Sequence, residues 1–121
     1  MVQAEADTSK NLLRVTYAGS IGLEDTRRAV EDLKGLLTGL APGFRLLTDL
    51  SRLERMDLAC VPDMEKMMDL CDCKGVETVV RVIPDPQKDI GFNILSLFHY
   101  SRQVRIITCQ TLPEALEALA A

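Results

Sequence analysis

Carboxylates, a serine and the single histidine are the side chains of this chain whose types could support chemistry. Asp49, Asp57 and Asp85 follow expected strands, and carboxylates gathered in that way can bind Mg²⁺. Aspartate and serine at such positions also cap helices and order turns, which is the role we expect for these three residues and for Ser51. His99 ends an apolar helix, where a capping or packing role is expected. We therefore expect no metal ion, no cofactor and no enzyme activity.

The four cysteines are the other candidates for chemistry. Cys71 and Cys73 form a C-x-C pair, but residues two apart on a helix point to nearly opposite faces, so one metal ion could not bind both. Cys60 lies close to an expected helix start, where a thiol can become more reactive. A small buried cysteine that packs like alanine is the other interpretation of Cys60.

Strands and helices alternate along the chain and must position these residues. Apolar residues recur at every second position in the expected strands and at three- and four-residue steps in the expected helices. Helix signals include Gly75 after the basic residue Lys74, and a T-x-x-E capping box from Thr111 to Glu114. The predicted strands span residues 11–19, 44–50, 76–83 and 103–109, and the predicted helices span residues 23–40, 61–74, 88–99 and 112–119.

This alternation predicts an α/β fold with the order β-α-β-α-β-α-β-α, in which a small mixed, mostly parallel sheet is covered by about four helices. We expect a single domain over residues 1–121, because 47% hydrophobic composition is enough for one core of this size. Residues 1–10 are expected to be loosely ordered or to form an extra edge strand. Ligands and partners of such sheets meet the loops beyond the carboxyl ends of the strands.

Composition limits the partners that these loops could bind. The net charge of -4 and the pI of ≈ 4.9 disfavour a nucleic-acid surface, which needs clustered basic residues. No apolar run is long enough to span a bilayer, and the first ten residues do not have the pattern of a signal peptide. We expect a cytoplasmic protein whose cysteines stay reduced.

Three short motifs resemble the STAS domain, which bacterial anti-sigma factor antagonists share with the tails of sulfate transporters. They are the strand that ends in D-L-S (49–51) and is separated by five residues from Asp57, the K-G pair (74–75) before a β-branched strand, and the "TLPEAL" helix (111–116). The order of elements is also similar to that of STAS-like proteins that share the CRAL-TRIO lipid-carrier fold. The resemblance implies a domain that binds proteins.

In anti-sigma factor antagonists the matching aspartate is followed by two hydroxyl residues and a glycine, and the second hydroxyl is phosphorylated. Here Asp57 matches the aspartate, Leu58 and Ala59 take the hydroxyl positions, and Cys60 takes the glycine position. A kinase needs an oxygen nucleophile, so the resemblance implies the scaffold without its phosphorylation switch at this position.

The sequence therefore predicts a non-catalytic regulatory protein-binding domain, whose partner is an anti-sigma-type regulator or a second copy of the chain. One alternative is a carrier or sensor of a small apolar ligand, held between the sheet and the methionine-rich helix or residues 92–98. A weaker alternative is a thiol redox sensor that uses Cys60. The expected partner-binding residues are Asp49, Ser51, Arg55, Asp57, Leu58, Ala59, Cys60 and Asp85.

Overall fold

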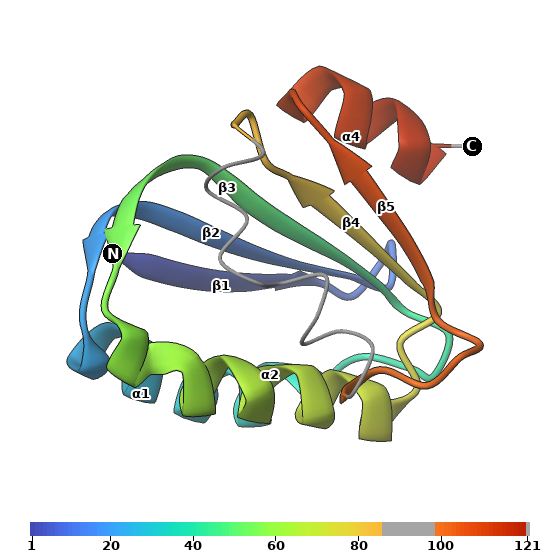
Figure 1. Cartoon of the computed structure of the whole chain (residues 1–121). Coiled ribbons are helices and arrows are strands. Elements are labelled where there is room, and N and C mark those ends of the chain that lie inside the picture. The colour runs from blue at the N-terminus through green and yellow to red at the C-terminus, as the bar shows by residue number, and fades with distance from the viewer. Residues whose placement is uncertain (86–98, 121) are drawn as a thin grey trace.

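The computed structural model describes residues 1–85 and 99–120. Five strands form one sheet in the order β1-β2-β3-β4-β5, in which β1 is antiparallel to β2 and all other neighbours are parallel (Figure 1). This is the mixed, mostly parallel sheet that the sequence predicts. The strands are β1 (Val2–Asp7), β2 (Leu12–Ile21), β3 (Arg45–Met56), β4 (Thr78–Val82) and β5 (Arg105–Cys109).

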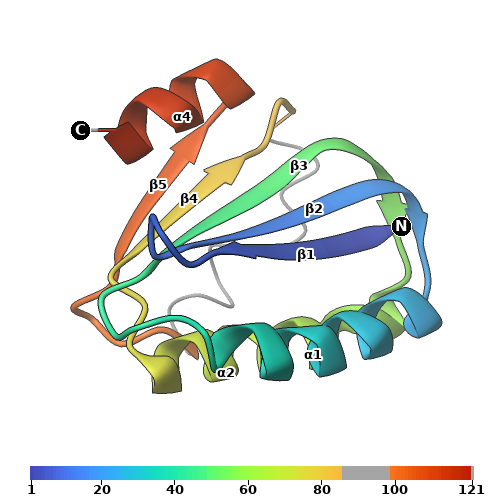
Figure 2. The same ribbon diagram turned by 180° about the vertical axis from the view of Figure 1, so that it is seen from behind.

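Helices cover the two faces of the sheet unequally. α1 (Leu23–Leu37) and α2 (Val61–Lys74) lie side by side on one face, and the shorter α4 (Leu112–Ala120) packs on the other face near β4 and β5 (Figures 1 and 2). The larger core cluster lies under α1 and α2, and a smaller cluster that includes Leu47, Val80 and Ala115 lies under α4. The fold therefore has two helices on one side of the sheet and one on the other.

β4 is covered on both faces, as its β-branched sequence predicts. Val79 and Ile83, the residue that follows the strand, belong to the larger core cluster, whereas Val80 and Val82 belong to the smaller one. β1 behaves differently, because it forms one edge of the sheet. Its even-numbered residues are half-buried against the core, and Gln3, Glu5 and Asp7 are exposed.

Local signals mark the starts of α1 and α4 and the end of α2 where the sequence predicts them. The carboxylate of Asp25 accepts a hydrogen bond from the Gly22 N–H at the start of α1. Gly75 ends α2 with a φ of 96°, in the left-handed region that favours glycine. At the start of α4, the Thr111 hydroxyl accepts a hydrogen bond from the Glu114 N–H and donates one to its carboxylate. Each of these contacts satisfies backbone groups that a helix end leaves free.

Two expectations need correction. β3 does not end at Ser51 but continues to Met56, because its second half stays paired with β2 although its side chains are largely polar. α1 ends at Leu37 and not at residue 40. The expected count of about four helices is not confirmed, since residues 1–85 and 99–120 contain three α-helices. The helix expected over residues 88–99 lies outside the described residues, apart from its last position.

Two glycines provide a matched test of this backbone. Gly75→Ala should lower the free energy of unfolding by about 1 kcal/mol or more, because an alanine disfavours positive φ and its Cβ would lie 3.2 Å from the Cβ of Pro42. Gly35→Ala, inside α1 with open space around it, should raise the free energy of unfolding by up to about 1 kcal/mol. Urea denaturation of both variants measures the difference. Equal effects of the two substitutions would contradict the assignment of Gly75 as the α2 cap.

Candidate protein-binding site

The junction between β3 and α2 is a short turn that Asp57 holds in place. Residues Leu58–Cys60 form a single 3-10 turn, and the Asp57 carboxylate accepts a hydrogen bond from the Ala59 N–H at 2.9 Å. The Asp57 N–H donates to the carbonyl of Ile21 at the end of β2, and its carbonyl accepts from the Cys60 N–H. The turn is thus fixed by hydrogen bonds at both of its ends, and we expect it to keep one shape.

Leu58 projects from this turn into solvent. With 76% of its surface exposed, it is the most exposed large apolar side chain among the described residues, ahead of Leu116 at 48% and Met1 at 46%. Ala59 beside it is also exposed, whereas Cys60 is completely buried in the larger core cluster. The two positions that carry hydroxyls in the STAS motif therefore lie on the surface, but they present only hydrocarbon.

A hollow lies next to the turn, where the end of β2 meets the end of β3. The Arg55 guanidinium closes one side of it by donating a hydrogen bond from Nε to the Ser20 hydroxyl at 3.3 Å. The hollow combines polar and apolar groups at an exposed edge of the fold, as a partner surface does. Its walls are Ser20, Ile21, Gly22, Arg55, Met56 and Asp57.

The structure separates the remaining predicted site residues from this turn. Asp49 lies within β3 and is only 4% exposed; its carboxylate accepts a hydrogen bond from the Ser51 N–H and is 3.6 Å from Arg14. Ser51 is exposed within the same strand. Asp85 is exposed three residues after the end of β4, a strand that packs against α4, whereas the turn at Asp57 leads from β3 into α2 on the other face of the sheet (Figures 1 and 2). Arg55, Asp57, Leu58 and Ala59 are the predicted residues that share one surface.

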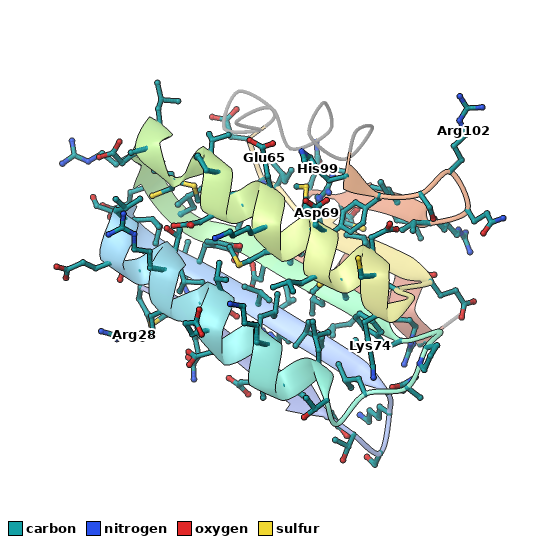
Figure 3. The ribbon with its side chains drawn as sticks, turned by 90° about the horizontal axis from the view of Figure 1, so that it is seen from below. Arg28, Glu65, Asp69, Lys74, His99 and Arg102 are labelled. Atoms are coloured by element: carbon teal, nitrogen blue, oxygen red, sulfur yellow. The ribbon has the colours of Figure 1, made fainter. Side chains whose placement is uncertain are left out.

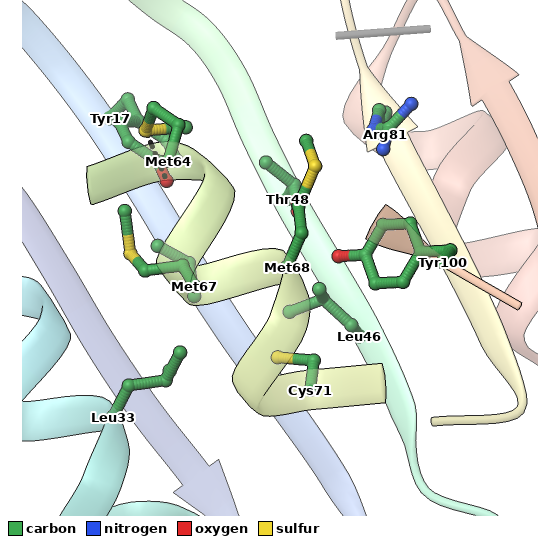
Figure 4. A pocket seen from close by; sticks show the side chains of 11 residues that line it. Tyr17, Leu33, Leu46, Thr48, Met64, Met67, Met68, Cys71, Arg81 and Tyr100 are labelled. Carbon is green, nitrogen blue, oxygen red and sulfur yellow. Dashed lines mark hydrogen bonds between the residues drawn. The ribbon is translucent and has the colours of Figure 1, made fainter. Parts of the chain in front are cut away.

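A small cavity lies between α2 and the sheet, where the carrier alternative placed its ligand, but the sequence analysis did not identify Tyr17, Arg81 and Tyr100 as lining residues. Its volume is ≈ 30 Å³, and Arg81, Tyr17 and Tyr100 bring polar groups to walls that are otherwise formed mainly by aliphatic and sulfur-containing side chains (Figure 4). The Tyr17 hydroxyl donates a hydrogen bond to the sulfur of Met64 at 3.6 Å. Arg81, 1% exposed, interrupts the valines of β4, and this charged residue within an apolar strand was the available signal.

Burial raises the pKa values of one thiol and two phenols around this cavity. It raises the pKa of the Cys71 thiol to about 12, and it raises the pKa of both Tyr17 and Tyr100. Cys73, two residues further along α2, is exposed, which agrees with the expected opposite orientation of the C-x-C pair. Within residues 1–85 and 99–120, no three histidine, cysteine or acidic side chains are grouped so that they could hold a metal ion.

Comparisons with known proteins identify the fold. No family model matches the sequence, and no curated protein has a significantly similar sequence. The solved structures, in contrast, show the fold: this chain has the SpoIIAA-like fold. A protein from Shewanella loihica, described as having that fold, superposes with a TM-score of 0.73 and 18% identity over 98% of this chain and 92% of its own.

Two further structures have known regulatory descriptions. The anti-sigma factor antagonist SpoIIAA, in its unphosphorylated form, has a TM-score of 0.66 and 14% identity, covering 100% of this chain and 99% of its own. SiaC of Pseudomonas aeruginosa has a TM-score of 0.55 and 13% identity over 90% of this chain and 91% of its own, and SiaC is described as the activator of the diguanylate cyclase SiaD. In the described parts of this chain, no helix has both the length and the apolar character needed to cross a bilayer.

Substitution of Asp57 tests the turn itself. Asp57→Ala should lower the free energy of unfolding by about 1 kcal/mol, because the Ala59 N–H loses its acceptor. Asp57→Asn should cost much less, since asparagine caps helix starts about as well as aspartate. Chemical denaturation compares the two variants. Equal destabilisation by both would show that the charge of Asp57, and not its cap, stabilises the turn.

Thiol labelling tests the burial of Cys60. In the folded protein Cys60 should react with an alkylating agent far more slowly than Cys73, because Cys60 is 0% exposed and Cys73 is on the surface. Peptide mass spectrometry after a time course at neutral pH gives both rates in one sample. Labelling of Cys60 as fast as that of Cys73 would favour the redox-sensor alternative.

Proposed function

We propose that this chain is a non-catalytic regulatory protein-binding domain that contacts its partner through the surface of Arg55, Asp57, Leu58 and Ala59. Asp49 and Cys60 are buried and cannot reach a partner in this structure, so they are left out of the contact surface. Ser51 and Asp85 are exposed elsewhere and could at most extend it. We place this function in the cytoplasm, in keeping with the four free cysteines and the acidic composition.

One observation carries the proposal: Leu58 is 76% exposed on a turn that is hydrogen-bonded at both ends. Complete burial of a leucine side chain against a partner contributes about 1.5–3 kcal/mol. Because the turn is already ordered, little conformational entropy would be lost when the partner binds. Leu58 therefore has the properties of an anchor residue at the centre of a contact.

The structural neighbours support a protein partner. SpoIIAA is described as an anti-sigma factor antagonist and SiaC as an activator of another protein, and we infer an anti-sigma-type regulator as the partner here. A structure of phosphorylated SpoIIAA also matches this fold. Since Leu58 and Ala59 have no hydroxyl, we propose that the contact at this turn is not controlled by phosphorylation of these residues.

The two alternatives have weaker support. The cavity of ≈ 30 Å³ between α2 and the sheet has room for about one water molecule, whereas sites for small molecules have volumes of roughly 300–1,000 Å³. A carrier function would thus require the methionines around the cavity to move. A thiol sensor would require Cys60, which is completely buried, to become accessible.

Two exposed leucines on opposite faces of the sheet give a matched test. Leu58→Asp should reduce capture of the partner about tenfold or more, because a carboxylate cannot enter the apolar pocket that a leucine anchor fills. Leu116→Asp introduces the same change on α4 and should leave capture unchanged. Affinity capture from the native cytoplasm, quantified by mass spectrometry, identifies the proteins that the unmodified chain retains and measures both variants against it.

Two outcomes would contradict the proposal. Loss of capture in Leu116→Asp but not in Leu58→Asp would place the contact on the α4 face. Equal capture by all three proteins would exclude both leucines from the contact. Far-UV circular dichroism confirms beforehand that each variant is folded, and a substitution at an exposed position should change stability by less than about 0.5 kcal/mol.

A further inference from the structure

Three carboxylates on α2 hold the segment from His99 to Ser101. Glu65, Asp69 and Asp72 are spaced four and three residues apart, so they follow one face of the helix. Figure 3 shows His99 directly beside Glu65 and Asp69. Asp72 continues the contact one turn further, where its carboxylate accepts a hydrogen bond from the Ser101 N–H at 2.8 Å.

The His99 ring lies between two acceptors. Its Nδ1 is 2.8 Å from a carboxylate oxygen of Asp69, and its Nε2 is 2.7 Å from a carboxylate oxygen of Glu65. A neutral imidazole has one N–H donor and one acceptor nitrogen, so it can satisfy only one of the two carboxylates. The other contact would then bring two acceptors together. The imidazolium form donates to both carboxylates, and the observed geometry therefore suits a protonated His99.

Tyr100 connects this surface cluster to the interior. It lies between the two anchored residues and is only 8% exposed. Its ring lines the cavity between α2 and the sheet together with Met68 and Cys71, and its hydroxyl points into that space (Figure 4). The contacts of His99 and Ser101 with α2 thus keep a tyrosine inserted between the helix and the sheet.

We propose that residues 99–101 form a proton-controlled clip, in which protonated His99 fastens the segment to α2 and loss of its proton lets Tyr100 withdraw from the cavity. The clip makes no use of the Leu58 surface, so it is independent of the proposed function. Its opening would enlarge the cavity that Tyr17, Arg81 and Tyr100 line.

The direction of the pH effect follows from the surroundings of His99. The hydrogen bond with Asp69, followed by the charge of Asp69 and the contact with Glu65, raises the pKa of His99 above its ordinary value of 6.5. Glu65 and Asp69 are the charged groups among the described residues that face the ring. A raised pKa in the folded state means that the clip contributes fully below pH 6.5 and loses its contribution as the pH rises through the folded-state pKa of His99.

The composition makes the proposal directly measurable. His99 is the single histidine, so NMR titration of its ring protons gives its pKa without assignment of other residues. The chain has two tyrosines and no tryptophan, so a Tyr17→Phe variant leaves Tyr100 as its only strong fluorophore. Between pH 5 and pH 9 neither tyrosine ionises, because burial raises both pKa values above 10. Acrylamide quenching of the Tyr100 fluorescence should rise about twofold or more as the pH rises through the pKa that NMR gives for His99. Such a rise is expected for local opening.

Substitutions of single carboxylates distinguish the clip from general unfolding. In the Tyr17→Phe background, Asp69→Asn should move both the NMR midpoint and the quenching midpoint toward 6.5, and Asp32→Asn on exposed α1 surface should move neither. His99→Gln should give high quenching at every pH while the far-UV circular dichroism stays unchanged. Quenching that stays constant while His99 titrates would overturn the proposal, and so would an Asp69→Asn variant that shifts neither midpoint.

Discussion

The site and the core both depend on how β3 is paired. Residues 45–49 of this strand have neighbours on both sides, because they pair with β2 and with β4. From Leu50 to Met56 the ladder with β4 has ended and the pairing with β2 continues, interrupted by two register shifts. The second half of β3 therefore extends past the shorter strand and carries the chain away from α4. The Asp57 turn lies at the far end of this extension, beside the end of β2.

This extension also explains where the sequence was informative and where it failed. The β-branched residues of β4, the glycine after α2 and the Thr111 cap act through local physics, so they could be identified from the sequence. The end of β3 could not, because Ser51, Arg52, Glu54 and Arg55 face solvent in a strand that has one partner, and such a strand lacks a continuous apolar pattern. The D-L-S motif was therefore interpreted as a strand end, although it lies in the middle of β3.

The site residues also divide into those whose roles depend on local sequence and those whose roles depend on tertiary contacts. Asp57 was predicted to cap the following turn, and this depends on residues two positions apart. The exposure of Leu58 and the burial of Asp49 depend on which strands are adjacent, which local patterns do not determine. The contacts of His99 with Glu65 and Asp69 join residues at least 30 positions apart, and no periodicity in the sequence indicates them. Arg81 is a charged residue within the apolar strand β4, but the sequence analysis did not use this signal.

The edge strand β1 has a consequence for the width of the sheet. Its outer edge carries backbone groups that another strand could pair with, and Glu5 and Asp7 project from it into solvent. The Ser9 hydroxyl and the Lys10 N–H lower the pKa of Asp7, so this carboxylate stays charged over a wide pH range. Two copies that met edge to edge would bring like charges together, and electrostatic repulsion would oppose the addition of a sixth strand.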